Sequence, residues 1–147
     1  MTGDIRALTV QQPWAHAIAH LDKRTENRTR PLRRGIETLF IHAGKAPLDP
    51  RAAEPFFHRR IRLPEDLAYG AIVAVTSIVG CCGAGFPGAR GGCDCDSWAA
   101  DGQWHWQLGD VTPLREPVPC KGALGLWKPT PDVIDAVLAQ LRVAVSS

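Results

Sequence analysis

Hydrophobic and polar positions along the chain predict a series of short strands. We expect strands at 5–10, 36–42, 70–79, 104–108 and 112–117, and a last strand segment within 122–127. These segments are rich in β-branched, aliphatic and aromatic residues and are bounded by Gly or Pro. The segment 70–79 is apolar on both faces, as in a strand buried on both sides. Gly109-Asp110 is a typical turn between the two strands that flank it.

The spacing of apolar residues also predicts three helices. The first begins at Pro13, which suits a first helical turn, and its apolar positions are Trp14, Ile18 and Leu21. The second is expected at 50–60, with Asp49 as its N-cap. The third covers about 131–145, after Thr130, and its apolar stripe consists of Ile134, Val137, Leu138, Leu141 and Val145. We expect this last helix to pack on the outside of the sheet, and the alternative is that it docks a partner.

Length and composition agree with one small α+β domain over 1–147. The 147 residues are 45% hydrophobic and 22% charged, which is ordinary for a globular chain and excludes a disordered, collagen-like or coiled-coil protein. The 14 Gly and 12 Pro favour a loop-rich fold of short strands over a helix bundle. No apolar run approaches the roughly 18–20 residues that span a bilayer, so we expect no membrane partner. The segment Met1-Thr2-Gly3-Asp4 has no signal-peptide character, and we expect a cytoplasmic location.

Charge is distributed unevenly along the chain. Residues 1–62 hold 12 Lys/Arg and 6 Asp/Glu, whereas residues 63–147 hold 5 and 9. The densest basic stretch runs from Lys23 to Arg34, and its candidate phosphate contacts are Arg28, Arg30, Arg33 and Arg34. Basic groups gathered in one half can bind nucleic-acid phosphates, while the alternative is a solvated surface.

The five cysteines are Cys81, Cys82, Cys93, Cys95 and Cys120. An odd number without a secretion signal argues against a disulfide framework. The first four lie within 15 residues and are weak candidates for a structural zinc site, because zinc is often held by closely spaced cysteines. Reduced thiols and a disulfide formed on oxidation are the alternatives. The nearby GxGxxG at 83–88 lacks a following helix, so we predict no nucleotide cofactor there.

Two further groups could carry chemistry. Lys23 would be a catalytic amine if it were desolvated, since burial lowers a lysine pKa, and Glu26 could relay the proton. The alternative is a surface ion pair. The sequence Trp104-His105-Trp106 puts two aromatic rings on one face of a strand, either as core or as a stacking platform for a base.

Several short motifs follow one another along about residues 5–128. The first three are Leu8-Thr9-Val10-Gln11-Gln12-Pro13-Trp14-Ala15, Lys23-x-x-Glu26-Asn27-Arg28 and Leu39-Phe40-Ile41-His42-Ala43-Gly44-Lys45. The later ones are Gly70-Ala71-Ile72-Val73-Ala74-Val75, His105-Trp106-Gln107-Leu108, Pro113-Leu114, Pro117-Val118-Pro119 and Gly122-x-x-Gly125-Leu126-Trp127. In this order they resemble the ASCH family of the PUA-like superfamily.

The resemblance implies a small β-barrel with flanking helices and a cleft beside the first helix. It implies association with nucleic acid, most often RNA, and the cleft residues carried over are Gln12, Trp14, Lys23, Glu26, Arg28 and His42. One branch of the family hydrolyses acetylcytidine with a Lys, a Thr three positions later and a more distant Glu. Lys23 matches that Lys, whereas Glu26 stands at the Thr position.

Together these features predict a binding module for RNA or another single-stranded nucleic acid, with a cleft for a nucleotide or unpaired base. The proposed catalytic pair is Lys23 and Glu26, and the proposed binding residues are Gln12, Trp14, Arg28, Arg30, Arg33, Arg34, His42, Lys45, His105 and Trp106. The alternatives are an amidohydrolase acting on a modified, acylated cytidine-type nucleoside, a ribonuclease, and a metal-stapled interaction protein. No cofactor is expected beyond a possible structural zinc.

Overall fold

The computed structural model describes residues 3–32, 34–83 and 95–146. Its strands are β1 (Ile5–Val10), β2 (Thr25–Arg28), β3 (Ile36–Ala43), β4 (Ala71–Cys82), β5 (Trp104–Leu108), β6 (Thr112–Pro119) and β7 (Leu126–Trp127). Its helices are α1 (Trp14–His20), α2 (Pro50–His58) and α3 (Pro131–Ser146). The fold is therefore α+β, with every predicted strand and helix present and one additional strand, β2. None of the helices among the described residues is long and apolar enough to cross a membrane.

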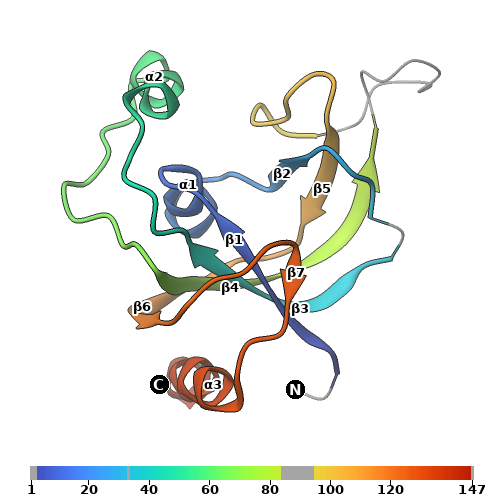
Figure 1. Cartoon of the computed structure of the whole chain (residues 1–147), viewed down its shortest axis with the longest axis vertical. Helices are drawn as coiled ribbons and strands as arrows, with labels where there is room; N and C mark the ends of the chain where they lie inside the picture. The colour runs from blue at the N-terminus through green and yellow to red at the C-terminus, as the bar shows by residue number, and fades with distance from the viewer. Residues whose placement is uncertain (1–2, 33, 84–94, 147) are drawn as a thin grey trace.

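The strands form one mostly antiparallel sheet in the order β2-β5-β4-β3-β1-β7, and β6 also pairs with β4 (Figure 1). Only β1 and β3 run parallel among the pairs described. The long strand β4 pairs with β3 along one edge. Its other edge pairs first with β6 and then with β5, with the register shifting between Ile78 and Gly80.

The predicted turn at Gly109-Asp110 therefore does not make a hairpin. The two strands it connects, β5 and β6, lie end to end on the same edge of β4 instead of pairing with each other. Gly109 donates its backbone N–H to the Ser77 carbonyl at 3.0 Å, and Thr76 Oγ1 donates to the carbonyl of Asp110 at 3.0 Å. These bonds hold the link against β4, where the chain passes from one partner segment to the next.

The expected barrel is not closed. The path of paired strands ends at β2 on one side and at β7 on the other, and no backbone ladder joins these two strands in the described part of the chain. The reason is length, because β7 has two residues and pairs only with Ala7 and Leu8 of β1. The end of β1 beyond Leu8 is left to face β2 across a gap. The Arg28 side chain bridges this gap by donating from Nη2 to the Thr9 carbonyl at 3.1 Å.

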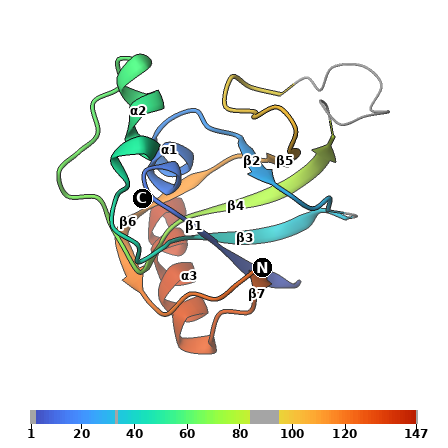
Figure 2. The same ribbon diagram turned by 45° about the horizontal axis from the view of Figure 1, so that its top comes forward.

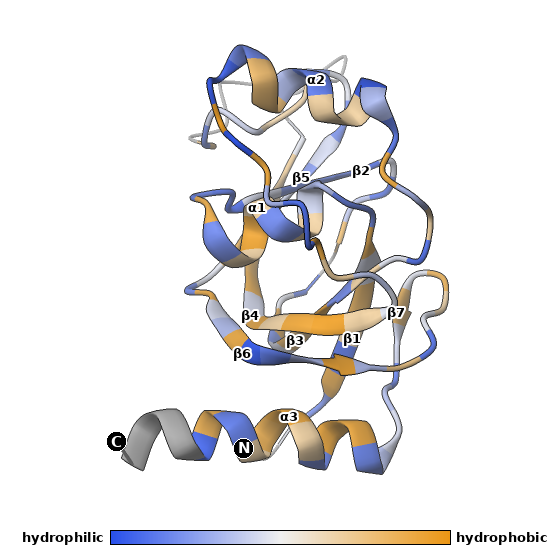
Figure 3. Cartoon of the chain, turned by 90° about the vertical axis from the view of Figure 1, so that its left-hand side faces the viewer, coloured by the Kyte–Doolittle hydropathy of each residue, from blue (hydrophilic) through white to orange (hydrophobic). Residues whose placement is uncertain are grey.

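The two faces of the sheet bury separate hydrophobic clusters, with α1 on one face and α3 on the other (Figures 1 and 3). On the α1 face the cluster includes Ile18, Leu39 and Ile41. On the α3 face Phe40 and Ile72 pack with Val133 and Val137. The prediction that the last helix packs on the sheet is confirmed, although Val133 belongs to its buried side and lies outside the predicted stripe.

Helix α2 lies beyond α1, farther from the sheet (Figure 2). Asp49 caps it as predicted, because its carboxylate accepts the Arg51 N–H at 2.9 Å. Its buried residue Phe56 joins a third, smaller cluster with Trp98 and Ala17, against which Trp14 is packed. This cluster fixes the segment after residue 95 beside α1, and that placement forms one wall of the pocket described next.

Candidate functional site

A pocket of about 600 Å³ occupies the gap between β1 and β2. Its lining comes from the end of β1 and start of α1, from residues 23–28, from the segment 98–103 and from the loop before β7. The lining residues are Thr9, Val10, Gln11, Trp14, Lys23, Glu26, Asn27, Arg28, Trp98, Ala100, Gln103, Ala123, Leu124 and Gly125. The pocket exists because the sheet does not close here.

Three charged side chains, each in contact with the next, line the gap. Lys23 follows the end of α1, its side chain is 2% exposed, and its Nζ donates to the Thr25 carbonyl and lies 3.4 Å from Oε1 of Glu26. The other carboxylate oxygen of Glu26 accepts from Arg28, at 2.9 Å from Nε and 2.7 Å from Nη2. In a continuous strand, the side chains of residues 23 and 26 would point to opposite faces. Lys23 lies before β2, which begins at Thr25, so its side chain does not follow this alternation and reaches Glu26. The carboxylate is thus shared between one deeply buried cation and one partly exposed cation.

Burial governs the charge state of the amine. It lowers the pKa of Lys23 below its ordinary value, because the ammonium loses its water, and the nearby Glu26 carboxylate opposes the shift only in part. Such a group holds its proton less firmly than a surface lysine does. A lysine of this kind in a pocket is a candidate for binding or proton transfer.

Asn27 fastens the segment 98–103 to the sheet. Its Nδ2 donates to the Trp98 carbonyl at 3.0 Å, and its Oδ1 accepts the Ala100 N–H at 2.9 Å. The Trp98 ring is held from two further sides, since its Nε1 donates to Asp22 at 2.9 Å and the Arg59 guanidinium lies 3.9 Å from the ring centroid. We call residues 96–103 the Trp98 wall.

His42 positions the opposite wall and does not itself line the pocket. Its Nε2 bonds to the Cys120 carbonyl at 2.9 Å, and its Nδ1 lies 3.2 Å from the hydroxyl of Thr9. The same hydroxyl bonds the Ala123 carbonyl at 3.2 Å and accepts from Trp127 Nε1 at 3.2 Å. Burial lowers the pKa of His42, which favours the neutral ring. The loop with the exposed Leu124 is therefore tied to β1 and β3.

The pocket also presents an aromatic ring and two amides. Trp14 is half-buried, with its ring centroid 5.0 Å from that of Phe56. Gln11 and Gln103 line the pocket, and their side chains make no hydrogen bond to any other part of the chain that the structure describes. Their donors and acceptors are available to a ligand.

Four of the predicted site residues come together in the pocket, namely Trp14, Lys23, Glu26 and Arg28. Gln12 is buried outside it, where its amide bonds the Ala68 carbonyl and the His16 N–H. Arg30, Arg34 and Lys45 are exposed and do not line it, and Arg33 lies outside the described residues.

The two β5 residues predicted to bind nucleic acid, His105 and Trp106, do not line the pocket. Trp106 is buried in the α1-side core and donates from Nε1 to the Arg30 carbonyl at 2.9 Å. His105 points to the opposite face of β5, as its alternation with Trp106 predicts, and lies behind the Trp98 wall. Sequence reasoning missed Thr9, Gln11, Asn27 and Gln103. Of these, Asn27 stands inside the Lys-x-x-Glu-Asn-Arg motif, which was the available signal.

The cysteines separate into two groups. Cys82 and Cys95 come together with His105, and these three side chains could hold a metal ion. Cys81 and Cys120 lie apart from this cluster, and the Cys81 sulfur accepts the Leu32 N–H at 3.5 Å. Cys93 is outside the described residues.

Comparison with known proteins does not assign the chain to a family. No protein-family model matches the sequence. No curated protein matches it either.

Proposed function

We propose that the pocket binds a nucleobase, carried by a nucleotide or by an unpaired residue of single-stranded RNA. The observation that carries this proposal is the buried Lys23–Glu26 pair in a pocket that also presents Trp14 and two glutamine amides without partners in the described chain. A volume of about 600 Å³ lies in the usual range for pockets that enclose small organic ligands. Unpaired bases are bound by stacking on aromatic rings and by hydrogen bonds to their edges.

The polarity of the pocket matches a base edge. The Lys23 ammonium can donate to a ring nitrogen or carbonyl, and 3.4 Å away the Glu26 carboxylate can accept from an exocyclic amine. Gln11 and Gln103 add groups that both donate and accept. Bases display donors beside acceptors on one edge, so a donor and an acceptor side by side select such a heterocycle over a simple anion.

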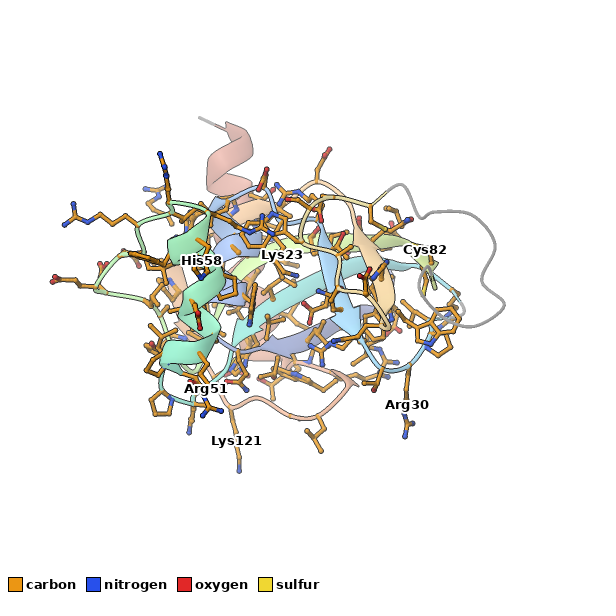
Figure 4. The ribbon with its side chains drawn as sticks, turned by 90° about the horizontal axis from the view of Figure 1, so that it is seen from above. Lys23, Arg30, Arg51, His58, Cys82 and Lys121 are labelled. Atoms are coloured by element: carbon orange, nitrogen blue, oxygen red, sulfur yellow. The ribbon has the colours of Figure 1, made fainter. Side chains whose placement is uncertain are left out.

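Phosphates of the same strand would contact arginines of the basic segment 28–34. Arg28 lines the pocket, and Arg30 follows two residues later with its side chain pointing outward (Figure 4). Arg34 is exposed as well. The motif resemblance to the ASCH family, which includes the residues 23–28 of this pocket, supports the choice of RNA.

Calorimetric titration with nucleoside 5′-monophosphates and short unstructured RNAs tests the proposal. We expect saturable binding that Gln103→Ala weakens without lowering thermal stability, because this amide has no partner in the described chain. Gln140→Ala is the matched control, since Gln140 lies on α3 and bonds the backbone of Glu116. Absence of binding to every probe, or equal weakening by both variants, would overturn the proposal.

A second candidate is hydrolysis of an acyl amide on such a base. It is favoured by the lowered pKa of the Lys23 amine and by the carboxylate beside it. In this reaction the neutral Lys23 amine takes a proton from water, and the resulting hydroxide adds to the acyl carbon. The bond between the acyl carbon and the exocyclic nitrogen of the nucleobase then breaks, as that nitrogen receives a proton. Glu26 would pass the proton between the two steps.

Mass spectrometry of acetylated and unmodified nucleosides decides between the two candidates. Release of acetate by the native protein and not by Lys23→Met would establish the hydrolase. No release of acetate, together with binding of the unmodified nucleotide, would leave the binding module. Equal turnover by the native protein and Lys23→Met would exclude Lys23 as the catalytic base.

A further inference from the structure

Three potential metal ligands converge behind the Trp98 wall. The sulfur atoms of Cys82 and Cys95 lie 3.1 Å apart, and Nδ1 of His105 lies 3.7 Å from the Cys82 sulfur. All three donor atoms lie within 4.8 Å of one another. Cys82 and His105 are directly opposite each other on the neighbouring strands β4 and β5, so the sheet itself holds two of the three. Cys82 lies apart from Lys23 (Figure 4).

These separations approach those of a tetrahedral zinc site. Zinc bonds of about 2.3 Å to sulfur and about 2.0 Å to nitrogen place two sulfurs about 3.8 Å apart, and a sulfur and a nitrogen about 3.5 Å apart. The sulfur–nitrogen distance of 3.7 Å fits directly. The sulfur pair needs to open by less than an ångström, which a small rotation about χ1 of either cysteine provides.

The histidine ring is oriented as a ligand. Its Nε2 lies 2.6 Å from the Ala100 carbonyl, and since a carbonyl can only accept, Nε2 carries the hydrogen. In the neutral ring the lone pair is then on Nδ1, which faces Cys82. Histidines that bind metals typically donate their other N–H to a carbonyl or carboxylate in this way.

Gln107 completes the surroundings of the two sulfurs. Its Nε2 lies 3.7 Å from the Cys82 sulfur and 3.8 Å from that of Cys95. An amide donor aimed at both sulfurs stabilises thiolate character, which metal binding requires.

We infer that Cys82, Cys95 and His105 form a zinc site, in which two thiolates and one neutral imidazole are the ligands from the described residues and a fourth ligand completes the tetrahedron. Two thiolates neutralise the charge of Zn²⁺, so the partly buried site carries no net charge. The zinc binds β4 and β5 to the start of the Trp98 wall, because Cys95 directly precedes that wall and His105 holds the Ala100 carbonyl. The site is therefore structural, and it fixes one side of the pocket.

Metal analysis of the intact chain tests this inference. The protein is purified in reductant, equilibrated with Zn²⁺ and desalted, and we expect one tightly held zinc per chain. Cys82→Ser and Cys95→Ser should each lose the zinc, whereas Cys81→Ser should keep it, because Cys81 neighbours Cys82 in sequence but lies outside the cluster. Substitution with Co²⁺ should give thiolate-to-metal absorption bands that Cys82→Ser removes.

Three outcomes would overturn the inference. One is native protein without zinc after equilibration. Another is zinc retained at full stoichiometry by Cys82→Ser. The last is native protein purified in reductant whose mass is two hydrogens lighter, with a Cys82–Cys95 disulfide. Amide hydrogen exchange tests the structural role of the metal separately. Removal of zinc by a chelator should speed exchange in residues 96–101 more than in β3. Equal exchange rates with and without zinc would refute the structural role.

Discussion

Replacing Asn27 by Ala should detach the Trp98 wall from the sheet. The substitution removes two hydrogen bonds, of 3.0 Å to the Trp98 carbonyl and 2.9 Å from the Ala100 N–H. Each such bond contributes about 1 kcal/mol net, so we expect the free energy of unfolding to fall by about 2 kcal/mol. With a urea slope of about 2 kcal/mol/M, the unfolding midpoint should fall by about 1 M.

The assay is urea unfolding followed by tryptophan fluorescence and by circular dichroism. Thr29→Ala is the control, because Thr29 is exposed just after β2 and its loss should cost within about 0.5 kcal/mol. The affinity for the nucleotide should fall in Asn27→Ala as well, since the wall then loses its position. A midpoint equal to that of Thr29→Ala would refute the role of Asn27 in holding the wall.

Three further predictions concern the sheet, α2 and the buried amine. Val137→Ala should lower the free energy of unfolding by about 2 kcal/mol in urea titrations, because Val137 is fully buried between α3 and the sheet. Asp49→Ala should cost about 1 kcal/mol by loss of the α2 cap, with nucleotide affinity unchanged by calorimetry. Burial lowers the Lys23 pKa from its ordinary 10.5, so the unfolded chain holds more protons just below pH 10.5. Stability should therefore rise with pH in that window, measured as the urea midpoint, and the rise should be smaller in Lys23→Met.

Most of the fold was predictable because local pattern and global packing agree. The strands at 5–10 and 104–108 begin and end as predicted, and the Asp49 cap sets the start of α2. The wrong predictions concern which strands pair with each other, because a local sequence pattern does not encode strand pairing. Gly109-Asp110 has the composition of a hairpin turn, yet β4 is long enough to pair with β5 and β6 in succession.

The candidate site was predictable in part for a related reason. The motif over residues 23–28 identified the charged side chains that meet in the pocket. The Trp98 wall could not be predicted, because it depends on contacts between Asn27 and residues more than 70 positions away. Of the two adjacent glutamines between β1 and α1, Gln11 lines the pocket and Gln12 is buried, a choice that the sequence leaves open.

The pocket draws its lining from segments as far apart as residues 9–14 and 123–125, so a ligand that touches all of them holds together most of the chain. Such a ligand binds only the folded protein, so it raises the free energy of unfolding by an amount that grows with the ratio of ligand concentration to Kd. At a concentration 100 times its Kd it would contribute about 2.7 kcal/mol. For a domain of this size that corresponds to a rise of several degrees in Tm. The melting temperature can therefore rank a panel of bases, nucleotides and modified nucleosides as ligands, whether or not the protein turns any of them over.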